Sequence, residues 1–241
     1  MIRYIETSNP ATKTNGPIYN EICDILGFDK VKKNNQNNFI LYPDDDAVHS
    51  IRMFYLDYQT WGRLYFFAPI INVPSMFRKY SNKDEVTYES FLYSLRKTYA
   101  DKFGQGLTEK LIDADNMLCY YVEFISYIEV VNSDKFIKGL EKYNFATEQL
   151  DISKFDEYKL KNSYVSFTIN SFNDNTIRLC AKCPNTALKK ITKIKGLDHL
   201  KADKVFDKEF AAELISNQAN KFTKPDKLNI FDKINILQTF G

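Results

Sequence analysis

The sequence contains little glycine, proline, histidine and tryptophan. Its 241 residues include 8 Gly, 7 Pro, 2 His and 1 Trp. The scarcity of Gly and Pro favours long regular elements over a loop-rich β-sandwich. With two histidines, general acid–base catalysis has few candidate residues.

The sequence also lacks every short motif that carries a known chemistry. It has no phosphate-binding loop, dinucleotide-binding GxGxxG, GxSxG elbow, HExxH zinc motif or kinase signature. We therefore expect no cofactor and no bound metal, and we predict that the protein is not an enzyme. The alternative is an enzyme of unfamiliar type that uses Cys180 or Cys183.

Four cysteines are too few, and too irregularly spaced, for a disulfide framework in a chain of this length. Cys180 and Cys183 form a CxxC, but structural zinc needs four ligands and a second such pair is absent. In a strand, positions three apart point to opposite faces. We expect one buried and one exposed thiol, without metal.

No signal peptide or membrane segment is evident. The longest apolar run, residues 64–73, contains Pro69 and Asn72 and is too short to span a bilayer. We expect a cytoplasmic protein without membrane contact, located in the host cytoplasm or the virion if a phage encodes it.

The charge is nearly balanced. Lys and Arg total 33 and Asp and Glu total 31, so no general attraction to nucleic acid is evident. One local basic patch can contact phosphates, although a solvated helix face is the commoner explanation of such a run. Its nucleic-acid candidates are Lys189, Lys190, Lys193 and Lys195.

The most distinctive segment is rich in aromatic residues and follows Asp44–Asp46. Apolar residues recur there at intervals of three and four, which predicts a helix capped by Asp44 or Asp45. The stripe comprises Ala47, Ile51, Phe54, Tyr58, Trp61, Tyr65 and Ala68. The alternative is a β-hairpin with strands at 50–58 and 63–68, and we favour the helix because the stripe is longer than the alternation.

Such an aromatic surface is most often core, but Tyr, Trp and Arg are also enriched at protein interfaces. A third use, stacking of unpaired bases, needs a basic groove that the segment lacks. The candidate interface residues are Arg52, Phe54, Tyr58, Trp61, Arg63 and Tyr65.

The remaining pattern predicts an α+β protein that is predominantly helical. A strand is expected at 1–6 and another at 39–42. The expected helices start near Pro17, Asn82 or Asp84, Thr108, Ser133, 185, Asp207 and Pro225, and the one from Asn82 or Asp84 is expected to end at Gly104. Alternation on both sides of Asn173-Asp174-Asn175 predicts an antiparallel hairpin at about 163–183. We expect a helix-rich portion at 1–150 and a smaller α+β portion at 151–241, and we find no internal repeat.

These features favour a non-enzymatic assembly or interaction protein that binds a protein partner or forms a homo-oligomer. The abundant Lys, Asn, Ile, Tyr and Phe have AT-rich codons, which suggests a low-GC bacterium or its phage as the source. A phage or mobile-element component such as a head–tail connector ring is one concrete version. The alternative is a nucleic-acid-binding or host-defence regulator that uses the lysine patch.

Overall fold

The structure is a computed structural model that describes residues 1–8, 21–22, 24–26, 31–35, 38–58, 62–80, 86–140, 147–152, 155–161, 166–194 and 199–219. It divides into two compact units. The N-terminal unit comprises Arg3–Tyr120 and His199–Asp203, and the C-terminal unit comprises Met1–Ile2, Tyr121–Asp198 and Lys204–Gly241. Each unit is described by itself.

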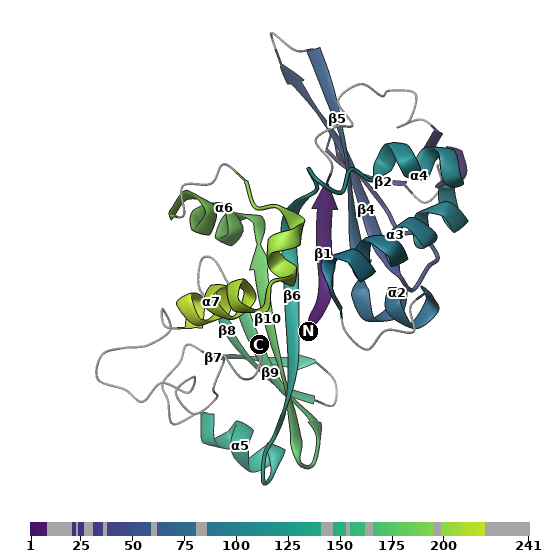
Figure 1. Ribbon diagram of the computed structural model, residues 1–241. Coiled ribbons are helices and arrows are strands. Elements are labelled where there is room, and N and C mark those ends of the chain that lie inside the picture. The colour runs from purple at the N-terminus through teal and green to yellow at the C-terminus, as the bar shows by residue number, and fades with distance from the viewer. Residues whose placement is uncertain are drawn as a thin grey trace. The chain divides into compact units, whose positions relative to one another are not determined.

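The N-terminal unit is an antiparallel sheet with helices on one side. Its strands lie in the order β2-β3-β4-β5-β1. They are β1 (Ile2–Ser8), β2 (Val31–Asn35), β3 (Asn38–Leu41), β4 (Val48–Tyr58) and β5 (Gly62–Asn72). The helices α2 (Val73–Tyr80), α3 (Tyr88–Phe103) and α4 (Gln105–Leu111) follow β5 (Figure 1).

Alternation along the strands places one set of side chains of this sheet against the helices. Ile5, Ile51 and Ile71 are fully buried in this set. Phe67 meets Tyr99 and Phe103 of α3 edge to face, with ring centroids 5.8 Å and 6.1 Å apart. These contacts stabilise the packing of α3 on the sheet, because they remove aromatic surface from water.

Helix α3 begins with reciprocal capping. Thr87 accepts a hydrogen bond from the Ser90 backbone N–H, and the Ser90 hydroxyl accepts one from the Thr87 backbone N–H. The helix ends at Gly104, whose φ of 77° lies in the region that favours glycine. The sequence predicted this helix and its end, but placed its start earlier, at Asn82 or Asp84.

The C-terminal unit is built in the same way. Its strands lie in the order β7-β8-β9-β10-β6. They are β6 (Leu118–Glu129), β7 (Thr147–Ile152), β8 (Phe155–Lys161), β9 (Ser166–Asn173) and β10 (Thr176–Pro184). The helices are α5 (Ser133–Leu140), α6 (Asn185–Ile194) and α7 (Lys208–Ala219), and a 3-10 turn, η3 (Ala202–Phe206), precedes α7.

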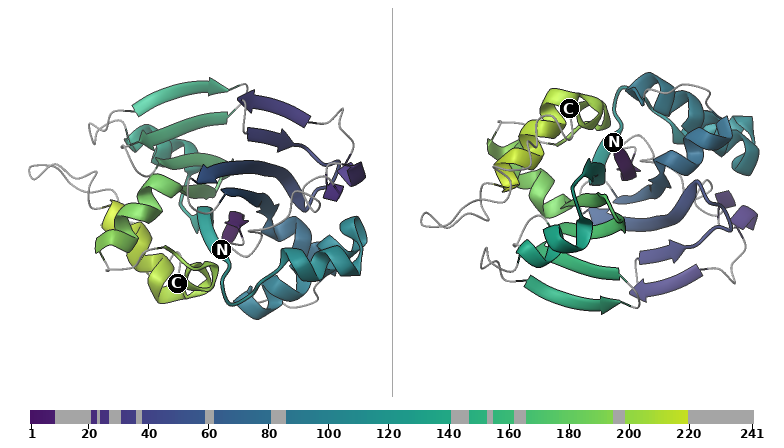
Figure 2. Two further views of the ribbon diagram at one scale, coloured as in Figure 1. Left: turned by 90° about the horizontal axis from the view of Figure 1, so that it is seen from above. Right: turned by 90° about the horizontal axis from the view of Figure 1, so that it is seen from below.

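The two units share one topology, which the sequence did not reveal as an internal repeat. Each has a first strand, a helical segment, a four-stranded meander whose last strand pairs with the first, and terminal helices. In the N-terminal unit the helical segment is described at residues 21–22 and 24–26, and in the C-terminal unit it is α5. Figure 2 shows the terminal helices of each unit on one side of that unit's strands.

The expectation of a predominantly helical protein is wrong, because sheets form the framework of both units. The predicted helix after Asp46 is the hairpin of β4 and β5, which was the rejected alternative. The predicted helix from Thr108 ends at Leu111 as α4, and its expected continuation is β6. In both places strand residues are apolar on two faces, so helical spacing arises by chance.

Other predicted elements are confirmed. The strand at the N-terminus is β1, the strand at 39–42 is β3, and the hairpin at 163–183 is formed by β9 and β10. Helices α5, α6 and α7 start where expected, and Asp207 accepts a hydrogen bond from the Phe210 backbone N–H at the start of α7. The helix expected at Pro225 lies outside the described residues. Within the described ranges, no helix is long and apolar enough to cross a membrane.

Candidate functional site

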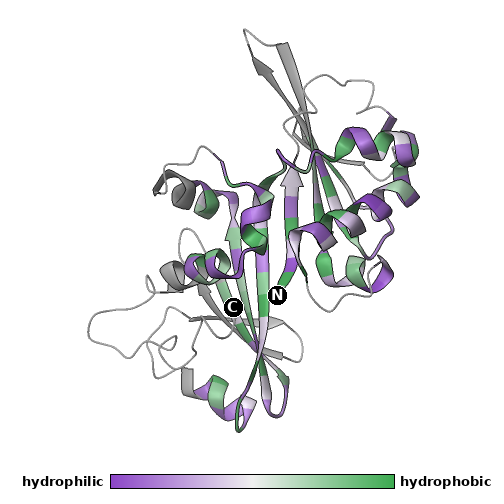
Figure 3. Ribbon diagram, in the orientation of Figure 1, coloured by the Kyte–Doolittle hydropathy of each residue, from purple (hydrophilic) through white to green (hydrophobic). Residues whose placement is uncertain are grey.

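The most elaborate polar cluster among the described residues lies on β6 and β10, on the sheet face opposite the apolar core. Glu123 is 2% exposed there. The Tyr121 hydroxyl donates a hydrogen bond of 2.8 Å to Glu123 Oε2, and Lys182 Nζ lies 3.7 Å from the same oxygen. The Cys180 thiol lies 3.7 Å from Oε1. Figure 3 shows hydrophobic and hydrophilic bands along β6, the strand that carries this carboxylate.

Burial keeps the Tyr121 hydroxyl of this cluster protonated. Burial raises the pKa of Tyr121 well above its usual value, and the neighbouring Glu123 charge adds to that effect. Tyr121 therefore acts as a hydrogen-bond donor throughout the physiological range. Lys182 extends its cation toward solvent, with a side chain 44% exposed, while neutralising the buried carboxylate. The carboxylate is thus stabilised by its neighbours and has little exposed surface to offer a substrate.

Cys180 and Cys183 lie on opposite faces of β10. Cys180 pairs with Ile125 in the register and Cys183 with Val122. Both thiols are buried, so the expectation of one exposed thiol is wrong. Burial raises the pKa of Cys183 to about 12. In the ranges that the structure describes, no group of His, Cys, Asp and Glu side chains is arranged to hold a metal ion.

The N-terminal unit has a buried carboxylate at the corresponding place. Glu6 of β1 forms an ion pair with Arg52 of β4, with Arg52 Nη2 2.7 Å from Glu6 Oε1. Burial raises the pKa of Glu6, and the Arg52 charge opposes that rise. Arg52, which the sequence suggested as an interface residue, thus has a role inside the unit.

The correspondence between the two carboxylates follows from the strand register. Tyr4 pairs with Asn72, the last residue of β5, and Tyr121 pairs with Pro184, the last residue of β10. Glu6 and Glu123 each follow two residues later. Tyr-Ile-Glu in β1 and Tyr-Val-Glu in β6 therefore occupy corresponding rungs of two units with one topology.

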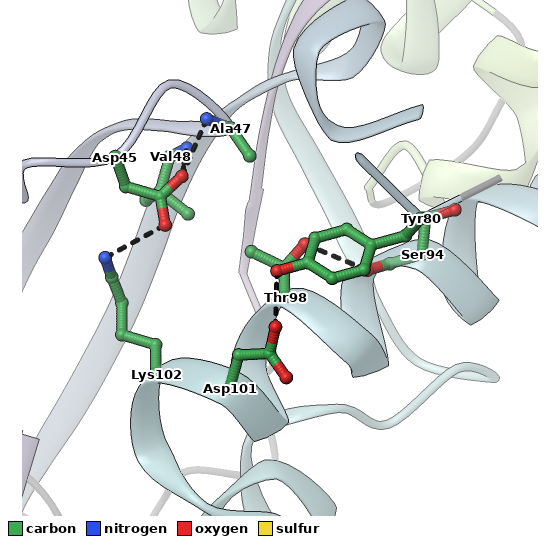
Figure 4. Close-up of polar contacts among 8 residues, drawn as sticks. All are labelled: Asp45, Ala47, Val48, Tyr80, Ser94, Thr98, Asp101 and Lys102. Carbon is green, nitrogen blue, oxygen red and sulfur yellow. Dashed lines mark hydrogen bonds and ion pairs between the residues drawn. The ribbon is translucent and has the colours of Figure 1, made fainter. Parts of the chain in front are cut away.

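The acidic run Asp44–Asp46, from which the sequence predicted a helix cap, has a different structural role. Asp45 Oδ1 accepts hydrogen bonds of 2.7 Å from Ala47 N and 3.3 Å from Val48 N, and Oδ2 lies 3.2 Å from Lys102 Nζ (Figure 4). Asp45 thus directs the chain into β4, and its predicted role as a helix cap is wrong because a strand follows. Figure 4 also shows Tyr80 donating to Asp101 Oδ2 at 2.7 Å, which links α2 to α3.

The other predicted candidates are distributed as follows. Phe54 and Tyr58 lie in β4, and Arg63 and Tyr65 in β5, paired with Asp57 and Tyr55. Trp61 and Lys195 lie outside the described residues. Lys189 is exposed on α6, and Lys190 and Lys193 belong to the same helix. The structure does not test their assignment to an interface or to nucleic acid.

An exposed aromatic pair was missed in the sequence. Tyr127 of β6 and Phe172 of β9 lie in contact, with ring centroids 4.8 Å apart. The register places Arg178 of β10 beside Tyr127 and Asn170. The Arg178 Nε–H donates to Asn170 Oδ1 at 3.1 Å.

Comparisons with known proteins identify no family. No family model matches the chain, and no curated protein matches it significantly. The crystal structure of the di-domain ARO/CYC BexL from the BE-7585A biosynthetic pathway is 8% identical over 91% of this chain and 94% of that chain, with a TM-score of 0.22. That of the di-domain ARO/CYC StfQ from the steffimycin biosynthetic pathway is 7% identical over 100% and 97%, with a TM-score of 0.23. Similarities this weak carry no argument about fold or activity.

Proposed function

We propose that this chain is a non-enzymatic assembly protein that associates with a second copy of itself through the β4–β5 hairpin. The observation that carries the proposal is the register of that hairpin. Strand β3 pairs with β4 from Ile51 to Phe54, and β1 pairs with β5 from Ile70 to Asn72. Beyond these rungs, Tyr55–Tyr58 and Gly62–Tyr65 pair with each other and, among the described residues, with no further strand. Figure 1 shows the hairpin extending past the end of β1.

The corresponding hairpin of the C-terminal unit does not extend in this way. There the whole length of β10 pairs with β6, from Thr176 opposite Glu129 to Pro184 opposite Tyr121. The β9–β10 hairpin of the C-terminal unit is therefore paired with a third strand to its end, whereas the β4–β5 hairpin of the N-terminal unit extends beyond its neighbouring strands. A two-stranded hairpin is marginally stable by itself in water, and its edges present unpaired backbone groups. A partner strand that pairs with an edge of the hairpin would stabilise it and would also satisfy the unpaired backbone groups.

The composition of the extended part favours a second copy as the partner. Its paired residues are Tyr55 with Tyr65, Leu56 with Leu64, Asp57 with Arg63 and Tyr58 with Gly62. The acidic residue and the basic residue of these pairs, Asp57 and Arg63, are register partners, so the paired segment has no net charge and two copies do not repel. A two-fold axis makes such a surface complementary to itself. A ring or connector in a phage particle is one form of such an assembly and stays a prediction.

Charge substitutions at the Asp57–Arg63 pair test the proposal. Asp57→Arg gives every hairpin two positive charges, and we expect self-association, measured by light scattering across a concentration series, to weaken at least tenfold. The exchange Asp57→Arg with Arg63→Asp restores neutrality and is expected to restore association. Glu109→Arg makes the same change of charge on exposed α4 and serves as the matched control. Association that Asp57→Arg leaves unchanged would contradict the proposal.

A further inference from the structure

Tyr127 and Phe172 form an exposed aromatic surface on the C-terminal unit. They are 47% and 57% exposed, and their rings meet at an interplanar angle of 64°. They lie on the face of β6, β10 and β9 opposite the core, because Tyr127 is the register partner of Arg178 and the Phe172 ring contacts the Tyr127 ring. Large aromatic side chains in mutual contact are costly to leave in water, which marks this end of the sheet as a binding surface.

A cation lies beside these rings. Arg178 Nε is held by the neutral Asn170 amide, and no carboxylate of the described side chains lies within ion-pair distance of its guanidinium. A guanidinium has five N–H donors, so Arg178 can still bind an anion. Lys182 lies four residues further along the same face of β10, about 13 Å away by the rise of a strand, with a side chain 44% exposed.

Among the side chains that the structure describes, no acidic group of this face pairs with Arg178. Glu157 of β8 is the register partner of Asn170, and its side chain is not among the described ones. Glu123 is buried against Lys182 and Tyr121. Glu129 is exposed two residues beyond Tyr127, at the end of the strand and opposite Thr176. The described carboxylates of this face are therefore one that Lys182 neutralises and one at the end of β6.

We propose that this face binds single-stranded nucleic acid, with bases stacked on Tyr127 and Phe172 and a phosphate held by Arg178. Unpaired bases stack on aromatic side chains of open sheet faces, and adjacent cations bind the backbone. The near-zero net charge of the chain excludes a strong general attraction to the phosphate backbone. Stacking should therefore contribute more to the affinity than ionic contacts, and the affinity should depend only weakly on salt concentration. The surface is separate from the β4–β5 hairpin, and its function does not depend on self-association.

Fluorescence anisotropy with a labelled 15-nucleotide oligothymidine at low salt tests this site. We expect the intact protein to bind the single strand at least tenfold more tightly than a duplex of the same length. The double variant Tyr127→Ala, Phe172→Ala should lose at least tenfold in affinity, and Arg178→Gln should lose affinity and reduce the salt dependence. Tyr93→Ala is the matched control, because Tyr93 is 55% exposed on α3 and lies near Lys97.

Leucine substitutions keep the test valid if the alanine variant unfolds. Tyr127→Leu, Phe172→Leu preserves apolar volume and removes both rings, and it should lose affinity while keeping the unfolding midpoint. Absence of binding by the intact protein, equal or tighter binding of the duplex, or binding that neither aromatic variant weakens would each overturn the proposal.

Discussion

Glu6 and Glu123 hold the same place in the two units: each is a buried carboxylate two residues after a tyrosine that pairs with the last residue of the fifth strand. Their partners differ. Glu6 is neutralised by Arg52 from β4, and Glu123 by Lys182 from β10. Both units thus have an acidic residue at the same rung, but the basic residue that neutralises it comes from a different strand in each unit.

Removal of the Glu123 carboxylate should destabilise the protein through Tyr121. Glu123→Ala removes the hydrogen bond that the half-buried Tyr121 hydroxyl donates to Glu123, at a cost of about 1–3 kcal/mol. Tyr121→Phe should cost less, and the double variant should cost less than the sum by about 1 kcal/mol. Urea unfolding midpoints of the four proteins complete this cycle. Additive effects would show that the 2.8 Å hydrogen bond contributes nothing.

The stability of the protein should depend on pH through Glu6. Because burial raises the folded-state pKa above 4.5, the carboxyl contributes most below its unfolded pKa, and that contribution is lost as pH rises through the folded pKa. The stability of Glu6→Gln relative to the intact protein should therefore increase as pH rises from about 4. Chemical unfolding at several pH values measures this difference. A difference that moves the opposite way would show that the Arg52 charge outweighs burial.

Asp45 should show the reverse dependence. Burial tends to raise its pKa, but hydrogen bonds from Ala47 and Lys102 dominate and lower it below 3.8. Its contribution is present above the unfolded pKa and is lost as pH falls through the folded pKa. We expect Asp45→Asn to cost about 1 kcal/mol at neutral pH, and the cost should disappear in acid. A cost that persists at pH 2 would contradict the role of the charge; Asp44→Asn, at an exposed neighbour, is the control.

Phe67 tests the strand register of β5. Its ring is buried against Tyr99 and Phe103, so Phe67→Ala should cost about 3–5 kcal/mol. Substitution of the partly exposed neighbour in β5, Ile70→Ala, should cost less. Thermal unfolding followed by circular dichroism measures both. Equal costs would contradict the assignment of these residues to different faces of the strand.

The sequence predicted elements with strong local signals and failed where tertiary pairing decides. Gly104 and Asp207 are terminal residues of helices, and their chemistry is visible locally. In β4 and β6 apolar residues occupy both faces, so alternation is hidden and helical spacing arises by chance. The partner of β6 is β10, about 55 residues further along the chain, and a single sequence does not reveal that pairing.

The paired carboxylates were also beyond prediction, for a related reason. Tyr-x-Glu is too short to be noticed twice in 241 residues. The available signal was a single acidic residue in the apolar run from Tyr121 to Ile125, since a charge in such a run is either exposed or paired. Its pairing with Lys182 required the register of β6 and β10.

Sedimentation velocity of a hairpin-shortened variant tests the central claim most directly. The variant lacks Tyr55–Tyr65 and joins Phe54 to Phe66, which are register partners, through an Asn-Gly turn. The intact chain of 28.2 kDa should sediment with at least twice that mass at micromolar concentration, and the variant should sediment as a folded monomer. A monomeric intact chain, or a folded variant that associates equally well, would contradict assembly through the β4–β5 hairpin.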